Sequence, residues 1–243
     1  MSNEIFTGSF TQQEPLPEAS ISAALRVMQS GRLHRYNTLP GETAETALLE
    51  QEFAAYMGAD YALAVASGGY ALATALRAVG VRPGDPVLTN AFTLAPVPGA
   101  IASVGAVPVF VGVTEALVID LDDLAAKAGE ARVLLLSHMR GHIADMDRLM
   151  AIADAAGLVV IEDCAHTMGA RWNGVLSGRH GLIGAYSTQT YKHLNSGEGG
   201  LLVTDDAAVA AKMTMLSGSY MLYDRHLAAP GPEVFEAVKY DTP

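Results

Sequence analysis

An aspartate and a lysine in this sequence could together hold a cofactor that carries an aldehyde and a pyridine ring. Asp163 ends an apolar run, and Lys192 lies between a later apolar run and a glycine-rich turn. A carboxylate beside a pyridine nitrogen keeps that nitrogen protonated, and a lysine amine forms a Schiff base with an aldehyde. Pyridoxal phosphate (PLP) requires this chemistry from a protein. The pair therefore predicts a PLP site, with Lys192 as its catalytic residue.

Two further side chains stand close to this pair in the sequence. Ser187 precedes Lys192 by five positions, where its hydroxyl could bind a phosphate oxygen while the amine reaches the aldehyde. His166 follows Asp163 by three positions and could lie against the cofactor ring or bond its phenolic oxygen, or it could be a structural histidine with satisfied hydrogen bonds. The ordinary alternatives for the first pair are a helix cap for Asp163 and an exposed loop position for Lys192.

The segment Ser67-Gly68-Gly69-Tyr70 joins a predicted strand to a predicted helix. Its two glycines let the main chain approach a ligand closely, and N–H groups at the start of a helix favour an anion such as a phosphate. A tight turn followed by a helix cap is the alternative, because glycine-rich turns between strands and helices are common. The segment matches neither GxGxxG nor a P-loop.

Other combinations of reactive residues in the chain do not form a recognisable site. His138 and His142 have the spacing of two ligands on one helix, but Gly141 interrupts them and no helix with a carboxylate is evident, so we predict no metal site. Cys164 is expected to pack as a small hydrophobic residue. No GxSxG nucleophile motif is present.

The elements that must position these residues alternate between short apolar runs and helical segments. Such alternation is typical of a parallel sheet covered by helices on both faces. We therefore predict an α/β fold with a mostly parallel, mixed sheet of about seven strands. Only the Lys192 segment separates the last two strands, so one of them could run antiparallel. The expected strands are 61–66, 86–89, 107–111, 133–137, 158–162, 184–188 and 200–204, and the expected helices are 17–29, 43–57, 70–79, 98–104, 121–127, 145–156 and 206–215.

Three of the segments named here follow predicted parallel strands. They are 67–70, 90–94 and 163–166. In an open α/β sheet, ligands bind outside the carboxyl ends of the strands. Topology alone therefore predicts that these three segments converge on one site.

The composition limits the class of protein. Half of the 243 residues are hydrophobic, which predicts a large buried core, and no apolar run approaches the ~20 residues of a membrane helix. The start of the chain lacks a signal peptide, and a single cysteine fits a reducing cytosol, so we expect a cytoplasmic protein. A net charge of −11 argues against nucleic acid as a partner but not against a small anionic ligand.

Taken together, these segments resemble the DegT/DnrJ/StrS family of sugar aminotransferases, which are PLP enzymes of fold type I. The likeness runs in register from about Pro17 to Arg225. Its most specific parts are the segment 162–166, which reads Glu-Asp-Cys-Ala-His, and Lys192 followed by Gly-Glu-Gly-Gly at 197–200. The resemblance implies the three-layer α/β/α large domain of fold type I, with PLP as the cofactor.

The resemblance also implies roles for single residues. Lys192 would be the Schiff-base lysine and proton-transfer base, Asp163 would pair with the pyridine nitrogen, and His166 would lie near the ring. Because residue 192 is lysine and not histidine, the resemblance favours transamination over the dehydratase branch of the family. The implied reaction moves an amino group from Glu or Gln to a keto-sugar that is linked to a nucleotide, in amino-sugar biosynthesis.

The resemblance further assigns the phosphate to Ser187 and to the main-chain N–H groups of Gly69 and Tyr70. Three of the cofactor-binding positions depart from the family. Family members usually have threonine and a small residue in place of Gly69 and Tyr70, and Leu94 stands where an aromatic residue usually stacks on the cofactor, with Phe92 two residues earlier. These departures predict a divergent branch with an unusual substrate.

The domain organisation that follows from the resemblance has three parts. We expect residues 1–16 to be an N-terminal arm, 17–225 to be the PLP-binding large domain, and 226–243 to be an incomplete linker toward a missing C-terminal small domain. Family members form homodimers in which a segment beyond this point reaches the partner's cofactor. Two alternatives to the aminotransferase stay open: a truncated, non-catalytic fragment, and another fold type I enzyme such as a lyase or desulfurase. The Gly-Glu-Gly-Gly turn argues against the second.

Overall fold

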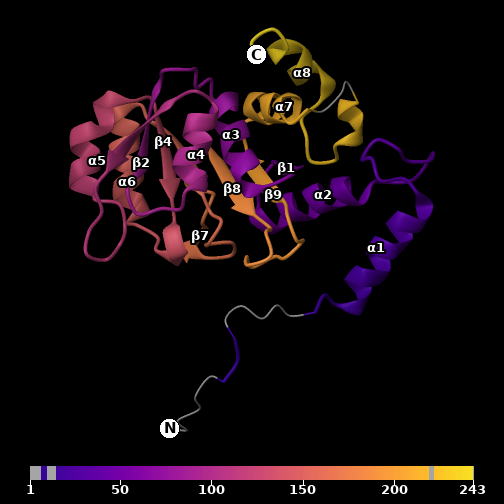
Figure 1. The fold of residues 1–243 in the computed structure, drawn as a ribbon. Coiled ribbons are helices and arrows are strands. Elements are labelled where there is room, and N and C mark those ends of the chain that lie inside the picture. The colour runs from indigo at the N-terminus through magenta and orange to yellow at the C-terminus, as the bar shows by residue number, and fades with distance from the viewer. Residues whose placement is uncertain (1–6, 10–14, 219–221, 243) are drawn as a thin grey trace.

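The computed structural model describes residues 7–9, 15–218 and 222–242 of the chain. Most of the expected N-terminal arm and the last residue therefore lie outside the described residues. A central sheet carries helices on both faces, and α1 extends away from it (Figure 1). The α-helices are α1 Glu18–Ser30, α2 Glu45–Met57, α3 Gly68–Ala78, α4 Pro96–Ser103, α5 Leu121–Lys127, α6 Met146–Ala156, α7 Ala207–Leu216 and α8 Pro232–Val238.

Seven strands form the central sheet, in the order β1-β9-β8-β5-β4-β2-β3. In this sheet β9 runs in the direction opposite to the other six strands, which confirms the predicted mixed sheet and identifies its antiparallel member. The connection from β8 to β9 is too short for the crossover that a parallel pair requires. The strands are β1 Tyr61–Val65, β2 Pro86–Asn90, β3 Val107–Val111, β4 Val133–Ser137, β5 Val159–Asp163, β8 Ile183–Ser187 and β9 Gly200–Thr204.

Two layers of helices bury the two faces of the sheet. One core cluster joins α3, α4 and α7 to one face, through residues such as Leu76, Ile101 and Ile161. The opposite face packs against α5 and α6 in a second cluster, and against α2 in a third. The predicted three-layer α/β/α architecture is therefore confirmed, and it explains why the central strands read as continuous apolar runs.

Register and capping align the strand ends that matter for the site. On β4 and β5, Ser137 pairs with Asp163, so these two strands end level with each other. Beyond β1, the side chain of Ser67 accepts a hydrogen bond from the Tyr70 N–H at 3.1 Å and so starts α3 as its N-cap. The carboxyl ends of β1, β4, β5 and β8 thus lie at one edge of the sheet.

The segment after residue 225 differs from the unpartnered linker that the sequence suggested. It contains α8, which packs on α7 and buries Phe235, and the Phe235 ring stacks on Tyr223 with ring centroids 3.9 Å apart. The Ala228 carbonyl also accepts a hydrogen bond from the Ala62 N–H on β1. Helix α8 has only seven residues, too few to show a helical period, and the surface it covers exists only after α7 has folded.

Helix α1 also differs from expectation, although its predicted range is confirmed. The sequence places Ile21, Leu25 and Met28 on one apolar side, which predicts a buried face. All three are exposed, and α1 contributes no buried residue. The helical spacing of apolar residues in α1 therefore does not correspond to a face that is buried within this chain.

A short hairpin of β6 Arg171–Trp172 and β7 Val175–Leu176 was not predicted, because two-residue strands carry no periodic signal. Within the described residues, no helix combines the length and the apolar character needed to cross a bilayer.

Candidate active site

The three segments that were expected to converge do so around one cavity. The cavity has a volume of about 420 Å³ and lies at the carboxyl-end edge of the sheet. Its walls come from the start of α3, the connection after β2, the end of β5 and the connection between β8 and β9. Six of the seven predicted site residues line it: Gly69, Leu94, Asp163, His166, Ser187 and Lys192.

The turn before α3 is built for close approach of the main chain. A side-chain carbon on Gly68 would lie 2.8 Å from Cβ of Ser187, so only glycine leaves room for the serine. A side-chain carbon on Gly200 would lie 2.4 Å from the Ser67 carbonyl oxygen. The first turn of a helix leaves its N–H groups without intrahelical acceptors. The turn thus places free main-chain N–H groups and the Ser187 hydroxyl side by side, as an oxyanion requires.

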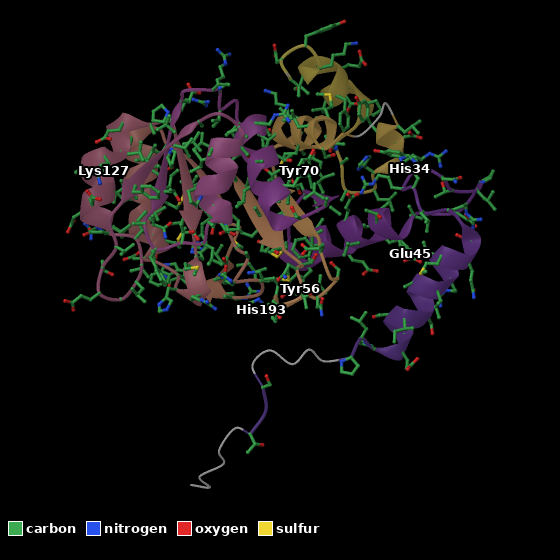
Figure 2. The ribbon with its side chains drawn as sticks, in the orientation of Figure 1. His34, Glu45, Tyr56, Tyr70, Lys127 and His193 are labelled. Atoms are coloured by element: carbon green, nitrogen blue, oxygen red, sulfur yellow. The ribbon has the colours of Figure 1, made fainter. Side chains whose placement is uncertain are left out.

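Tyr70 is the predicted site residue that does not line the cavity. Its N–H donates to Ser67, as the cap of α3, and its hydroxyl donates to the Leu216 carbonyl at the end of α7 (Figure 2). The expected phosphate contact from the Tyr70 N–H is therefore replaced by the helix cap. Gly68, which the sequence prediction did not select, lines the cavity instead, beside Gly69.

Asp163 ends β5 at the edge of the cavity. Its Oδ1 accepts the Ala165 N–H at 3.1 Å, and its Oδ2 accepts the Ser137 hydroxyl at 3.2 Å. Burial raises the pKa of Asp163, and these hydrogen bonds and nearby positive charge offset the effect only in part. A partly buried carboxylate held by two donors is suited to pair with a cation, and a pyridinium nitrogen supplies one.

Lys192 and His166 contact each other inside the cavity. Lys192 Nζ lies 2.8 Å from His166 Nε2. Burial lowers the pKa of Lys192, the charge of Asp163 opposes this, and the charge of Arg140 adds to it. Burial, followed by the charges of Lys192, Arg140 and His193, lowers the pKa of His166 to about 4. The exposed-loop alternative for Lys192 therefore does not describe this half-buried amine.

Leu94 belongs to an apolar wall of the cavity, together with Leu72, Val97 and Met139. Leu94 is 41% exposed, so its side chain faces the open cavity rather than the core. Phe92 contacts His142 edge-on, with ring centroids 6.5 Å apart. Leu94 has no aromatic ring, and the ring of Phe92 packs against His142.

Two contributors to the site were missed from the sequence. Ser137 links Asp163 to Thr93, whose hydroxyl donates to Ser137 Oγ at 2.8 Å. Arg140 has a left-handed main chain, with φ 56°, and donates its N–H to His166 Nδ1 at 3.3 Å. Ser137 could have been found from the sequence, because it is a hydroxyl residue at the end of the predicted strand 133–137. No sequence pattern predicts that an arginine adopts a left-handed conformation.

A buried hydrogen-bonded pair, His138 and Glu162, supports the end of β5 from behind the cavity. His138 Nε2 lies 2.9 Å from Glu162 Oε2, and the two Glu162 oxygens also accept the N–H groups of Gly178, His180 and Gly181. Burial alone would raise the pKa of Glu162, but the hydrogen bonds from His138 and from the main chain outweigh it and lower the pKa. Cys164 lies within 4.8 Å of both side chains. Because main-chain donors occupy the carboxylate, the cluster anchors the loop after β7.

These features fit PLP on three separate points. The α3 turn and Ser187 offer donors for a phosphate, and the apolar wall of Leu72 and Val97 suits a flat ring. At the opposite end, the partly buried Asp163 carboxylate lines the same cavity. The half-buried amine of Lys192 opens into the same cavity.

The fold and this arrangement of residues define the class: a three-layer α/β/α domain that matches PLP-dependent aminotransferases. Residues 17–225 match the DegT/DnrJ/EryC1/StrS aminotransferase family. The chain belongs to that family.

Individual relatives agree with this assignment. The L-glutamine:scyllo-inosose aminotransferase of Streptomyces griseus is 38% identical over 189 residues, which are 76% of this chain and 44% of that protein. A pleiotropic regulatory protein of Geobacillus stearothermophilus is 37% identical over 185 residues, 74% of this chain and 50% of that protein. The crystal structure of an aminotransferase from Psychrobacter cryohalolentis superposes with a TM-score of 0.78 at 33% identity, covering 84% of this chain and 51% of that one. The chain thus spans about half the length of the relatives it matches.

Proposed function

We propose that the protein is a PLP-dependent aminotransferase that moves an amino group from glutamine or glutamate to the ketone of a sugar or a related cyclitol. The observation that carries the proposal is the half-buried Lys192 amine, which shares one cavity with the Asp163 carboxylate and the donors of the α3 turn. Inosose aminotransferases among the relatives support glutamine as donor and a cyclic polyhydroxy ketone as acceptor. A nucleotide attached to the sugar is part of the proposal for the acceptor.

When bound, PLP supplies a carbon that takes up the amino group and a ring that withdraws electrons from it. The protein would do the rest. The N–H groups of Gly68 and Gly69 and the Ser187 hydroxyl would hold the phosphate, and Asp163 would keep the ring nitrogen protonated. The Lys192 amine, once free, would carry the proton between the substrate carbon and the cofactor carbon.

Assembly belongs to the same proposal. We propose that the active form is a homodimer, as the family resemblance implies. The exposed apolar side chains of α1, Ile21, Leu25 and Met28, are available for contact with a second chain. Light scattering on the purified chain would show a dimer mass, and a monomer at micromolar concentration would contradict this part.

A half-reaction tests the activity directly. Protein loaded with PLP is mixed with L-glutamine, without acceptor, and the 2-oxo acid released is measured against bound PLP. The proposal predicts about one equivalent of 2-oxo acid, together with loss of the absorption band near the visible edge. Alanine in place of Lys192 should prevent both.

The second candidate is a non-catalytic family fragment that keeps the fold. Leu94 in place of an aromatic residue and the diversion of the Tyr70 N–H support it. Retention of PLP at Lys192 without any release of 2-oxo acid would favour this candidate. Elimination products from the amino acid would instead favour a lyase or desulfurase.

A further inference from the structure

His166 has a hydrogen-bond partner at each of its two ring nitrogens. Nδ1 lies 3.3 Å from the main-chain nitrogen of Arg140, and Nε2 lies 2.8 Å from Lys192 Nζ. A neutral imidazole carries one proton, and the hydrogen bond at one nitrogen decides where that proton sits. The hydrogen bond at Nδ1 of His166 therefore also determines whether a protonated or an unprotonated Lys192 amine can bond to Nε2.

The proton can be assigned from the Arg140 contact alone. A main-chain N–H can only donate, so Nδ1 must accept and carries no proton. The ring is then neutral with its proton on Nε2, which points at Lys192 Nζ. An amine accepts a hydrogen bond only when it is unprotonated, because an ammonium group has no lone pair.

The main chain around Arg140 is strained in a way that serves this contact. Arg140 adopts φ 56° and ψ 21°, a left-handed conformation that costs a non-glycine residue about 1 kcal/mol or more. It stands in the short turn Met139–Gly141 after β4, and the His138 N–H ties the start of that turn to the Asp163 carbonyl. The strained conformation directs the Arg140 N–H at the His166 ring.

The charges that face this pair act in both directions. Asp163 on β5 favours the ammonium form of Lys192, and Glu198 lines the same cavity from the β8–β9 connection. Arg140 in the turn after β4 opposes the ammonium form, as does burial, and His193 adjoins His166. Burial and the charge of Arg140 together outweigh Asp163, so the net effect of the surroundings lowers the pKa of Lys192.

We propose that His166 is a positioning residue that donates its Nε2 proton to Lys192 and holds the cofactor-free lysine as a neutral amine ready to attack an aldehyde. The proposal deepens the proposed function, on which it rests for the identity of that aldehyde. Only the neutral amine is a nucleophile, so a lysine held in this form captures its aldehyde without first losing a proton to solvent.

The first test reads the tautomer in the wild-type protein. Nitrogen-15 NMR of the cofactor-free chain should show His166 protonated on Nε2 and unprotonated on Nδ1 at neutral pH. Arg140→Gly removes the side chain but keeps the N–H, so the same tautomer is expected there. A proton on Nδ1 in the wild-type protein, or a change of tautomer in R140G, would overturn the assignment.

The second test follows the amine itself. The chain has four lysines, and peptide mass spectrometry can give the rate at which a small neutral aldehyde and cyanoborohydride modify each one as pH is varied. His166→Phe keeps the site buried but removes the donor. Since a hydrogen bond contributes about 1 kcal/mol and one pKa unit about 1.4, the midpoint for Lys192 should rise by roughly half to one unit.

Lys212 on α7 is the internal control and should keep its midpoint in H166F. A downward shift at Lys192 would mean that its ammonium had been donating to His166, and it would overturn the proposal. If the variant does not fold, the tautomer measurement decides alone. Neither test contains PLP, so a protein that failed to bind PLP would disprove the proposed function and leave this result readable.

Discussion

Asp163, the residue that we propose to pair with the cofactor ring, is held in the fold at a cost to stability. Its carboxyl is surrounded by protein, and burial raises its pKa. In the cofactor-free chain, Ala165 and Ser137 donate hydrogen bonds to this carboxyl, and these bonds and nearby positive charge offset its burial only in part. A protein whose site holds a charged residue for a ligand that is not bound is commonly less stable than a variant with a neutral residue there.

Asp163→Asn should therefore stabilise the cofactor-free protein at pH 7, by roughly 1 kcal/mol, and abolish productive PLP binding. A carboxyl whose pKa is raised by folding loses stability as pH rises from about 4 through the folded-state value. The advantage of D163N should thus shrink as the pH falls toward 4. Urea unfolding at several pH values measures it, and an advantage that grew in acid would contradict the stated sign.

Some residues of the candidate site could be predicted from the sequence, and others could not. The meeting of Asp163, Lys192 and Ser187 in one cavity was predictable, because each lies at or beyond the carboxyl end of a strand and these ends share one edge of the sheet. The N–H of Tyr70 was expected to bind a phosphate, but the sequence does not show that Ser67 accepts a hydrogen bond from this N–H as the helix cap. The role of Arg140 depends on a left-handed φ, which only the folded chain reveals.

At the scale of elements, the site depends on how closely β9 and β8 approach the turn that starts α3. Gly68 lies against Ser187 on β8, and Gly200 on β9 lies against the Ser67 carbonyl. Strands and helices were predictable because apolar runs and helical periods are strong signals. The β6–β7 hairpin and α8 were not, because both are too short to show a period.

Gly200→Ala should disturb the turn, since its new carbon would lie 2.4 Å from the Ser67 carbonyl oxygen and 2.9 Å from the Gly68 nitrogen. We expect a loss of roughly 1–3 kcal/mol in unfolding free energy and weaker PLP binding. Gly99→Ala is the matched control, because Gly99 is an exposed position in α4 with no atom within 4 Å of the added carbon. G99A should be neutral or stabilise by about 0.5–1 kcal/mol. Equal effects for the two variants would refute the close approach.

For the whole molecule, the C-terminal segment is part of the folded unit rather than a loose connection. His226 lies in a buried cluster with Arg35 and Glu50, where Arg35 Nη1 is 2.7 Å from His226 Nδ1. This cluster joins the segment before α2 to the segment after residue 225. The three-layer architecture followed from the alternation of elements, but this closure did not, because its partners lie about 190 residues apart in sequence.

Phe235→Ala tests that closure. Phe235 is 1% exposed and packs between α7 and Tyr223, so its truncation should cost roughly 3–5 kcal/mol in unfolding free energy. Tyr240→Ala is the control, because Tyr240 is 89% exposed and should change stability by about 0.5 kcal/mol or less. A loss below about 1 kcal/mol in F235A would mean that α8 does not dock in solution.

The central claim is that Lys192 binds PLP covalently, and reduction with borohydride tests it most directly. The chain is saturated with PLP, reduced and digested, and the modified peptides are located by mass spectrometry. We predict one phosphopyridoxyl group for each chain, on Lys192, and none on Lys127, Lys212 or Lys239. An unmodified Lys192 at saturating PLP, or modification spread evenly over all four lysines, would contradict the account.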